Sequence, residues 1–350
     1  MALLFDAVIE DKGPKRHDSS RVSLICQSPS NARVTHQVDW QEPCFFALTG
    51  RLLQWAYDSS SCSTNKFVIP CPKHQHGASM YTLANAALEV SILDPIADQD
   101  RFGPRYCTGG YIFQVSDTRL GDLLSGPTYP DNFNWFDGQG IPDAFHPTLQ
   151  RDPASTDGLS LVLGIGLCDL QAKEVKEFCT WEVAQAETSI TMRTTHRHYN
   201  YVVELERTVT LIERTVRSFT RIANRGQSPI PMRWYPHPFY PQPTGDELVK
   251  FNNPVEPIED GGYRLGDNGF IARKGWPWQK GYYLSLNHTP THNLVVFQKH
   301  PKLGLVAGTC SYAPDYFPIW GNPRTFSWEP YLERTVGHGQ EFSWWIDYEF

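Results

Sequence analysis

The chain has little of what proteins that bind nucleic acids or membranes carry. Its 350 residues include 31 lysines and arginines against 38 aspartates and glutamates, for a formal net charge of −7. No basic run is longer than Lys15-Arg16, whereas binding to phosphate backbones needs a dense positive surface. No stretch approaches the roughly 20 apolar residues of a membrane helix, and the first residues lack the pattern of a secretory signal. We therefore expect a cytoplasmic protein with neither nucleic-acid nor membrane partners.

The cysteines form no recognisable framework. There are eight of them, scattered along the chain without a Cys-x-x-Cys pair, at positions 26, 44, 62, 71, 107, 168, 179 and 310. Disulfide scaffolds belong to short secreted domains, so we expect reduced thiols. The nearest approach to a metal motif is Cys71-Pro-Lys-His74-Gln-His76, whose spacing fits no standard zinc site. We predict no metal and no other cofactor.

Helical periodicity is almost absent, apart from a weak pattern at residues 170–178. Instead, apolar and polar residues alternate in short segments that Gly, Pro, Asn and Asp separate. The segments that we expect to be strands are residues 87–93, 110–115, 159–167, 188–195, 201–212, 216–224, 282–286, 294–297 and 342–348. Repeated short strands with turn signals between them are typical of an antiparallel sandwich. The predicted fold class is all-β, a large antiparallel β-sandwich.

Residues 1–78 differ in composition from the rest of the chain. They contain two strand-like pieces, at 22–26 and 44–48, and a Ser-rich turn at 59–65. Domain boundaries tend to fall in Pro- and Ser-rich stretches. We predict an N-terminal extension or small lobe over residues 1–78 and a β-sandwich domain over residues 79–350.

Aromatic residues are abundant, with 11 Trp, 16 Tyr and 19 Phe. Most of them are expected in the core. A smaller set lies beside turns or polar segments, where an indole face can stack on the C–H side of a sugar ring. These are Trp234, Trp276, Trp278, Trp320 and Trp328.

Two distant segments each combine a strand pattern with one proton-transfer group. In Arg233-Trp-Tyr-Pro-His237-Pro-Phe-Tyr240, alternation places Arg233, Tyr235 and His237 on one face, although the prolines limit regular pairing. In Phe326-Ser-Trp-Glu329-Pro-Tyr331 and the residues after it, the residues of one face are Ser327, Glu329, Tyr331 and Glu333. This pattern indicates a sheet with one packed side and one side that lines a pocket.

From Leu88 onward, the chain resembles the galactose mutarotase-like superfamily, which includes aldose 1-epimerases and sugar-phosphate epimerases. The pieces that carry the resemblance occur in the family's order. They are Gly109-Gly-Tyr-Ile-Phe-Gln-Val115, Gly121-Asp-Leu-Leu124, the segment from Leu205 through Asn224-Arg-Gly226, the segment around His237, and Phe317-Pro-Ile-Trp320-Gly-Asn322 with Ser327-Trp-Glu329-Pro-Tyr331. The resemblance implies a sandwich fold, and an isomerase that acts on a carbohydrate or sugar-like substrate.

In that family a histidine acts as general acid on the ring oxygen, while a glutamate takes the proton from the anomeric hydroxyl. His237 and Glu329 match these positions. Their chemistry is suitable, because opening a cyclic hemiacetal needs one donor and one acceptor with pKa values within reach of neutrality. We expect the two groups about one sugar ring apart across a single pocket, and without this separation the enzyme interpretation loses its main support. The residues predicted to bind substrate are His146, Arg233, Trp234, Asp267, Trp320 and Tyr331.

Other interpretations remain open. His237 taken alone could be a core histidine, and Glu329 a solvated strand carboxylate. The same pair could also serve an isomerase or lyase with a non-standard substrate, because one fold hosts many activities. A third possibility is a carbohydrate-binding or regulatory protein without catalytic activity.

Overall fold

The computed structural model describes the strands at residues 22–27 and 33–38, and residues 80–129, 132–146, 158–256, 258 and 260–350. The chain divides into two units, residues 1–73 and 74–350. In the first, β1 (Val22–Gln27) pairs with β2 (Arg33–Val38) in an antiparallel arrangement. The strand predicted at 22–26 is therefore confirmed. The piece at 44–48, the Ser-rich turn and the cluster at 71–76 lie outside the described residues, and the predicted lobe over residues 1–78 remains a prediction.

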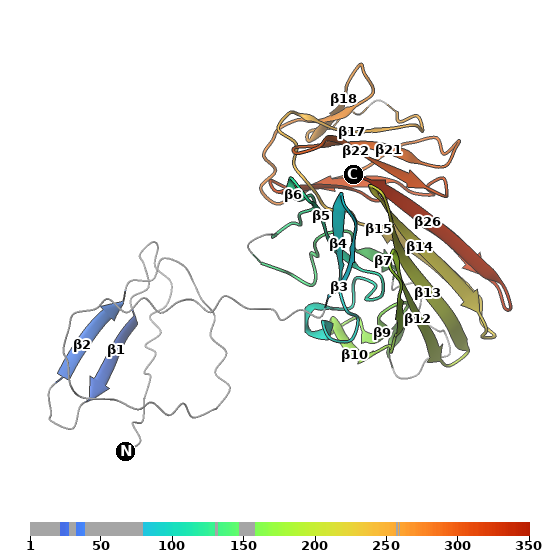
Figure 1. Cartoon of the computed structure of the whole chain (residues 1–350), viewed down its shortest axis with the longest axis horizontal. Coiled ribbons are helices and arrows are strands. Elements are labelled where there is room, and N and C mark those ends of the chain that lie inside the picture. The colour runs from blue at the N-terminus through green and yellow to red at the C-terminus, as the bar shows by residue number, and fades with distance from the viewer. Residues whose placement is uncertain are drawn as a thin grey trace. The chain divides into compact units, whose positions relative to one another are not determined.

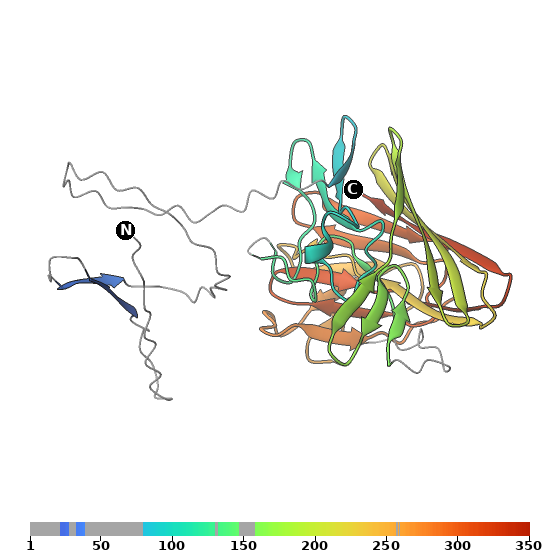
Figure 2. The ribbon, with the colours of Figure 1, turned by 90° about the horizontal axis from the view of Figure 1, so that it is seen from below.

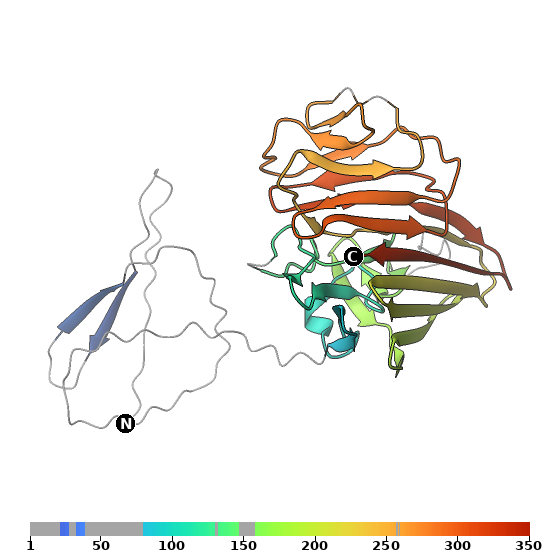
Figure 3. The same ribbon diagram turned by 45° about the horizontal axis from the view of Figure 1, so that its top comes forward.

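The second unit is built around a ten-stranded antiparallel sheet. In spatial order its strands are β11 (Glu182–Gln185), β12 (Ser189–His198), β13 (Tyr201–Ile212), β14 (Thr215–Asn224), β26 (Glu341–Glu349), β22 (Gly304–Cys310), β21 (Val295–His300), β17 (Glu247–Phe251), β19 (Ile271–Arg273) and β18 (Tyr263–Leu265). Figure 1 labels most of them, and Figure 3 shows β26 (dark red) between the olive hairpin and the orange-red strands. From below, the long strands lie along one side of the unit (Figure 2).

Four smaller antiparallel sheets complete this unit. One sheet contains β3 (Tyr81–Ala84), β4 (Leu88–Ile92), β5 (Ile112–Asp117) and β6 (Gly121–Asp122), and a second contains β10 (Glu174–Phe178), β9 (Gly166–Asp169) and β8 (Ser160–Val162). The third contains β25 (Leu332–Val336), β15 (Ile230–Pro236) and β7 (Asp143–Phe145). The fourth contains β16 (Tyr240–Pro241), β24 (Thr325–Trp328), β23 (Pro318–Gly321) and β20 (Tyr282–Ser285). The only helix among the described residues is the single 3₁₀ turn η1 (Gln99–Arg101). No described helix has the length and apolarity to cross a membrane.

The alternating segments became strands that bury one face, except residues 159–167, which form the hairpin of β8 and β9 instead of one strand. β13 alternates buried and half-buried residues along nearly its whole length, with Val203, Leu205 and Val209 in the core. Its bounds are those predicted for 201–212. The weak helical pattern at 170–178 was misleading, since residues 174–178 form the strand β10.

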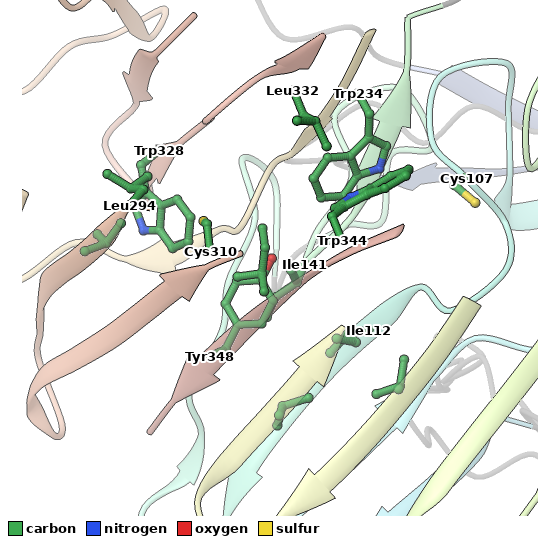
Figure 4. Packing of buried hydrophobic residues seen from close by; sticks show 14 of the residues in the cluster. Cys107, Ile112, Ile141, Trp234, Leu294, Cys310, Trp328, Leu332, Trp344 and Tyr348 are labelled. Atoms are coloured by element: carbon green, nitrogen blue, oxygen red, sulfur yellow. The ribbon is translucent and has the colours of Figure 1, made fainter. Parts of the chain in front are cut away.

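Aromatic and aliphatic side chains from several sheets meet in one large core (Figure 4). Trp234 of β15 packs against Trp344 of β26, with ring centroids 5.2 Å apart. Trp328 of β24 is fully buried and lies near Tyr348 of β26. Packing against β26 of the ten-stranded sheet therefore fixes the positions of β15 and β24.

A buried ion pair joins the ten-stranded sheet to the three-stranded sheet of β15. Arg207 of β13 contacts Asp143 of β7, and their side chains are 2% and 8% exposed. Breaking such a pair leaves one charge buried without compensation, which is strongly destabilising. The pair lies next to the site described below, because Asp143 is in register with Pro236, the residue before His237.

Gly140 allows the segment before β7 to approach β5 closely. Its φ is +74°, and a Cβ added there would lie 2.3 Å from the carbonyl oxygen of Phe113. No other residue fits at this distance. The carbonyl of Gly140 accepts a hydrogen bond from the backbone N–H of Phe239 at 2.8 Å, so the close approach also supports the chain beside His237.

Candidate functional site

His237 and Glu329 lie in two bends that run side by side. His237 separates β15 from β16, and Glu329 separates β24 from β25. The register is the same on both sides of the bends, with Trp234 opposite Leu332 and Tyr240 opposite Phe326. Counting inward from either pair places His237 directly opposite Glu329. Prolines at 236, 238 and 330 explain why the ladder is interrupted here, since each removes a backbone donor.

The imidazole of His237 is held from three directions. Its Nε2 lies 3.2 Å from Oε1 of Glu329, and its Nδ1 lies 2.9 Å from Oγ of Ser327. Its backbone N–H donates to the carbonyl of Pro142 at 2.8 Å. His237 and Glu329 are each 5% exposed, and Ser327 is fully buried. The ring therefore has one defined orientation.

Aromatic rings enclose the imidazole. The ring of Phe239 is 4.3 Å away, centroid to centroid, and that of Trp320 is 6.0 Å away and nearly perpendicular. Tyr106 and Tyr235 approach to 6.4 Å and 6.3 Å. Trp320, predicted to bind substrate, is half-buried and thus remains accessible beside the proton-transfer pair.

Burial sets the protonation state of the pair. It raises the pKa of Glu329 to about 8 from its ordinary value of 4.5, against the smaller opposing effect of the Arg105 cation. It lowers the pKa of His237 well below the ordinary value, and Arg105 lowers that pKa further. At neutral pH the proton is therefore on Glu329, and the imidazole is neutral.

Arg105 is a member of the site that the sequence patterns did not identify. Its guanidinium donates to the carbonyl of Phe136 at 2.7 Å, lies 4.8 Å from the centroid of the Tyr106 ring, and interacts with the hydroxyl of Tyr235. It is the cation that acts on both members of the pair. Its only signal in the sequence is its position in a loop just before Gly109-Gly110, the first piece of the family resemblance.

A polar row lies further along the same sheet face. Arg233 forms an ion pair with Glu333, with 3.0 Å between Nε and Oε1, and its carbonyl accepts the backbone N–H of His146 at 2.7 Å. Burial, and after it the Arg233 cation, lower the pKa of His146. Arg233 is four residues from His237, which corresponds to roughly 13 Å along a strand. The structure thus brings His146 and Arg233 together, but at a distance along the strand from His237 and Glu329.

Tyr331 lies between the polar row and the pair. Its ring stacks on that of Tyr235 at 4.4 Å, and Arg233 lies 4.7 Å from its centroid. The ring of Tyr316 approaches it edge-on, with ring centroids 5.2 Å apart. Because Tyr331 is only half-buried, its predicted contact with a ligand is compatible with the structure.

Two of the predicted substrate-binding residues lie elsewhere. Trp234 is 2% exposed and points into the core toward Trp344 (Figure 4), so its predicted contact with a ligand is wrong. Asp267 lies in the turn between β18 and β19, at the edge of the ten-stranded sheet. There it lines a cavity of about 310 Å³ together with Glu247 and Arg264. His237 is not among the residues that line this cavity.

The expected separation of the acid and the base also needs correction. His237 and Glu329 are in contact and are not one sugar ring apart. The expectation was geometrically wrong, because the two oxygens that exchange protons in a cyclic hemiacetal are bonded to the same carbon. Neighbouring groups can therefore reach both of them from one side.

No arrangement for a metal ion is found among the described residues, in the sense of three or more His, Cys, Asp or Glu side chains that could hold one. The four cysteines whose side chains are described, Cys107, Cys168, Cys179 and Cys310, are free thiols.

Several solved structures are similar in fold to this chain. A galactose mutarotase-related enzyme from Lactobacillus acidophilus matches with a TM-score of 0.52 and 13% sequence identity, over 77% of this chain and 96% of that one. A protein from Synechocystis sp. PCC 6803 matches with a TM-score of 0.50 and 14% identity, over 77% of this chain and 94% of that one. No protein-family model and no curated protein matches the chain. The chain has the galactose mutarotase-like β-sandwich fold, as its motifs predicted.

Proposed function

We propose that this protein is an isomerase of the aldose 1-epimerase type, which opens and recloses a cyclic hemiacetal through His237 and Glu329. The observation that carries the proposal is the buried contact of 3.2 Å between these two side chains, which come from bends far apart in the sequence. An acid and a base in close contact beside a half-buried tryptophan are suited to move protons on a small polar ring.

The reaction needs no other reagent. One member of the pair protonates the ring oxygen while the other takes the proton of the anomeric hydroxyl. The bond between C1 and the ring oxygen breaks, and a carbonyl forms at C1. After rotation about the bond between C1 and C2, reclosure on the other face of C1 reverses both proton transfers and restores the pair.

The family resemblance assigns the acid role to His237 and the base role to Glu329. In the resting site the proton is on Glu329, so this assignment requires the proton to move to His237 when a sugar binds. The Arg105 cation favours the ionised carboxylate, although it opposes a charge on the imidazole. Sugar hydroxyls also replace some of the hydration that burial removed from Glu329.

The stacked Tyr235 and Tyr331 and the half-buried Trp320 supply flat surfaces next to the pair. The C–H faces of a sugar pack on such surfaces, whereas its hydroxyls need hydrogen-bonding partners. A small carbohydrate or a sugar-like cyclic hemiacetal is therefore the substrate class that we propose.

Saturation-transfer NMR tests the activity directly, because it measures the exchange between anomers at equilibrium. Free sugars and sugar phosphates are screened with the wild-type protein, and the substrate that exchanges fastest is kept. His237→Asn and Glu329→Gln should each slow the exchange by about 100- to 10,000-fold, the usual contribution of a positioned acid or base. The double variant should be little worse than the slower single one, because both groups act in one transfer.

Glu333→Gln is the matched control, since Glu333 lies on the same strand face with 47% of its side chain exposed. It should retain the exchange rate to within about tenfold. Loss of activity in Glu333→Gln together with full activity in Glu329→Gln would show that the base is assigned to the wrong residue.

One observation favours a second candidate, a carbohydrate-binding protein that catalyses nothing. The side chains of His237 and Glu329 are only 6% and 7% exposed, so a sugar reaches the resting pair along one edge at most. In that case sugars bind, but neither His237→Asn nor Glu329→Gln changes the rate of anomer exchange.

A further inference from the structure

The environment of His237 contains one group to which the proposed reaction assigns no role. Ser327 belongs to β24 and is fully buried. Its Oγ lies 2.9 Å from Nδ1 of His237, on the side of the ring opposite to Glu329. A buried hydroxyl is normally satisfied by a specific partner, and here that partner is the imidazole.

We infer that Ser327 is a positioning residue that holds the His237 ring in both of its proton arrangements, by reversing the direction of a single hydrogen bond. The reversal belongs to the pair itself, when it loses a proton to solvent. The inference rests on the proposed function only for its effect on turnover, in which Ser327 keeps the ring oriented while Nε2 gains and loses its proton.

The donors and acceptors of Glu329, His237 and Ser327 allow two arrangements. When the proton is on Glu329, its carboxyl donates to Nε2, so the ring proton is on Nδ1 and donates to the serine oxygen. When Glu329 is ionised and the imidazole neutral, Nε2–H donates to the carboxylate, and Nδ1 must accept. A hydroxyl can do both, because it is a donor and an acceptor and rotates to suit.

Other partners would fix one arrangement. A carboxylate or a backbone carbonyl next to Nδ1 only accepts, and so it would keep the proton on that nitrogen. The remaining charged group of the site is Arg105, which acts on both members of the pair, and the tyrosines nearest to the imidazole are Tyr106 and Tyr235. Among the described residues, the hydrogen-bond partner of Nδ1 is Ser327.

The first experiment needs no substrate. Long-range ¹H–¹⁵N NMR spectra distinguish which ring nitrogen of a histidine carries the proton, and the loss of one set of signals in His237→Gln assigns the ring. We expect the ring proton on Nδ1 at pH 6 and on Nε2 above the pKa of Glu329, which is about 8. A ring that keeps the same tautomer from pH 6 to pH 10 would overturn the inference.

The second experiment removes the hydroxyl. In Ser327→Ala, a proton on Nδ1 has no partner, so the tautomer with the proton on Nε2 is favoured and the transition moves to lower pH. On a verified substrate, kcat should fall by about 10- to 100-fold, the range for hydrogen-bond partners that orient metal-binding histidines, while KM changes little. Ser327→Thr keeps a hydroxyl and should restore both the transition and part of kcat.

Thr325→Val is the matched control. Thr325 lies on the same strand two residues away, is equally buried, and donates its hydroxyl proton to the carbonyl of Tyr240 at 2.8 Å. Removing the Thr325 hydroxyl therefore removes one buried hydrogen bond, but none that involves the imidazole of His237. If Thr325→Val shifts the tautomer of His237 as Ser327→Ala does, the effect is one of general packing and the inference is wrong.

The two proposals fail separately. A pH-dependent tautomer that responds to Ser327, in a protein that exchanges no sugar, upholds the role of Ser327 and refutes the isomerase. Sugar exchange with a tautomer indifferent to Ser327 refutes only the inference. If Ser327→Ala does not fold, the wild-type titration still decides, because it requires no variant at this position.

Discussion

Replacing Glu329 should change how the stability of the protein depends on pH, whatever its substrate. Burial raises the pKa of Glu329 from 4.5 to about 8. Between these values the folded state holds a proton that the unfolded state has lost. The free energy of unfolding must therefore fall as the pH rises, and it stops falling above the pKa of the folded state. Glu329→Gln removes this contribution because glutamine does not titrate.

The size of the effect follows from the shift. One pKa unit corresponds to 1.36 kcal/mol, so between pH 6 and pH 9 the wild type should lose about 3 kcal/mol relative to Glu329→Gln. The pKa of His237 is lowered, so this residue reduces the free energy of unfolding only below pH 6.5, the ordinary pKa of histidine. Most of the range from pH 6 to pH 9 lies above that value. The free energy of unfolding of Glu329→Gln, relative to that of the wild type, should therefore increase steadily as the pH rises.

The assay is urea denaturation at a series of pH values from 6 to 9, with linear extrapolation to water. Glu333→Gln, at the exposed position on the same strand face, should follow the wild type throughout. A relative change below about 1 kcal/mol, which exceeds the usual error of such extrapolations, would refute the reasoning, because Glu329 would then not be desolvated as the structure shows.

Three further changes test the framework around the site. Arg207→Met should cost about 3–5 kcal/mol in urea denaturation, because it leaves the buried Asp143 carboxyl without its cation, whereas Arg225→Met, at an exposed position just after β14, should cost little. Gly140→Ala should cost about 3 kcal/mol or more through its clash with Phe113; Gly304→Ala, with a φ of +75° but open space around it, should cost only about 1 kcal/mol. Deleting residues 1–78 should leave a soluble domain that melts cooperatively, and aggregation would show that these residues complete its core.

The sequence predicted the strands well because their signal is local. Alternation along 201–212 reproduced β13, and the polar faces around His237 and Glu329 were correct because a strand face depends only on parity. The same rule should have excluded Trp234, which is adjacent to Arg233 and therefore on the opposite, buried face. That error came from reading proximity to a polar segment as exposure.

Other parts of the site could not be predicted in this way. Arg105 reaches the pair through the packing of a loop, which no periodic pattern encodes. The contact between His237 and Glu329 depends on the register of two bends more than 80 residues apart along the chain, and a one-residue slip would have placed the side chains on opposite faces. Asp267 was a candidate for the family's active-site aspartate by its order along the chain, which does not determine its position in space, and its turn lies at a sheet edge away from the pair.

The most direct test of the central claim is a crystal structure of Glu329→Gln with the sugar that exchanges fastest in the NMR screen. The account predicts that the anomeric hydroxyl and the ring oxygen both lie within hydrogen-bonding distance of the side chains at positions 237 and 329, with the sugar ring against Trp320 or Tyr331. A sugar bound elsewhere, with the side chains at 237 and 329 still in contact only with each other, would contradict it.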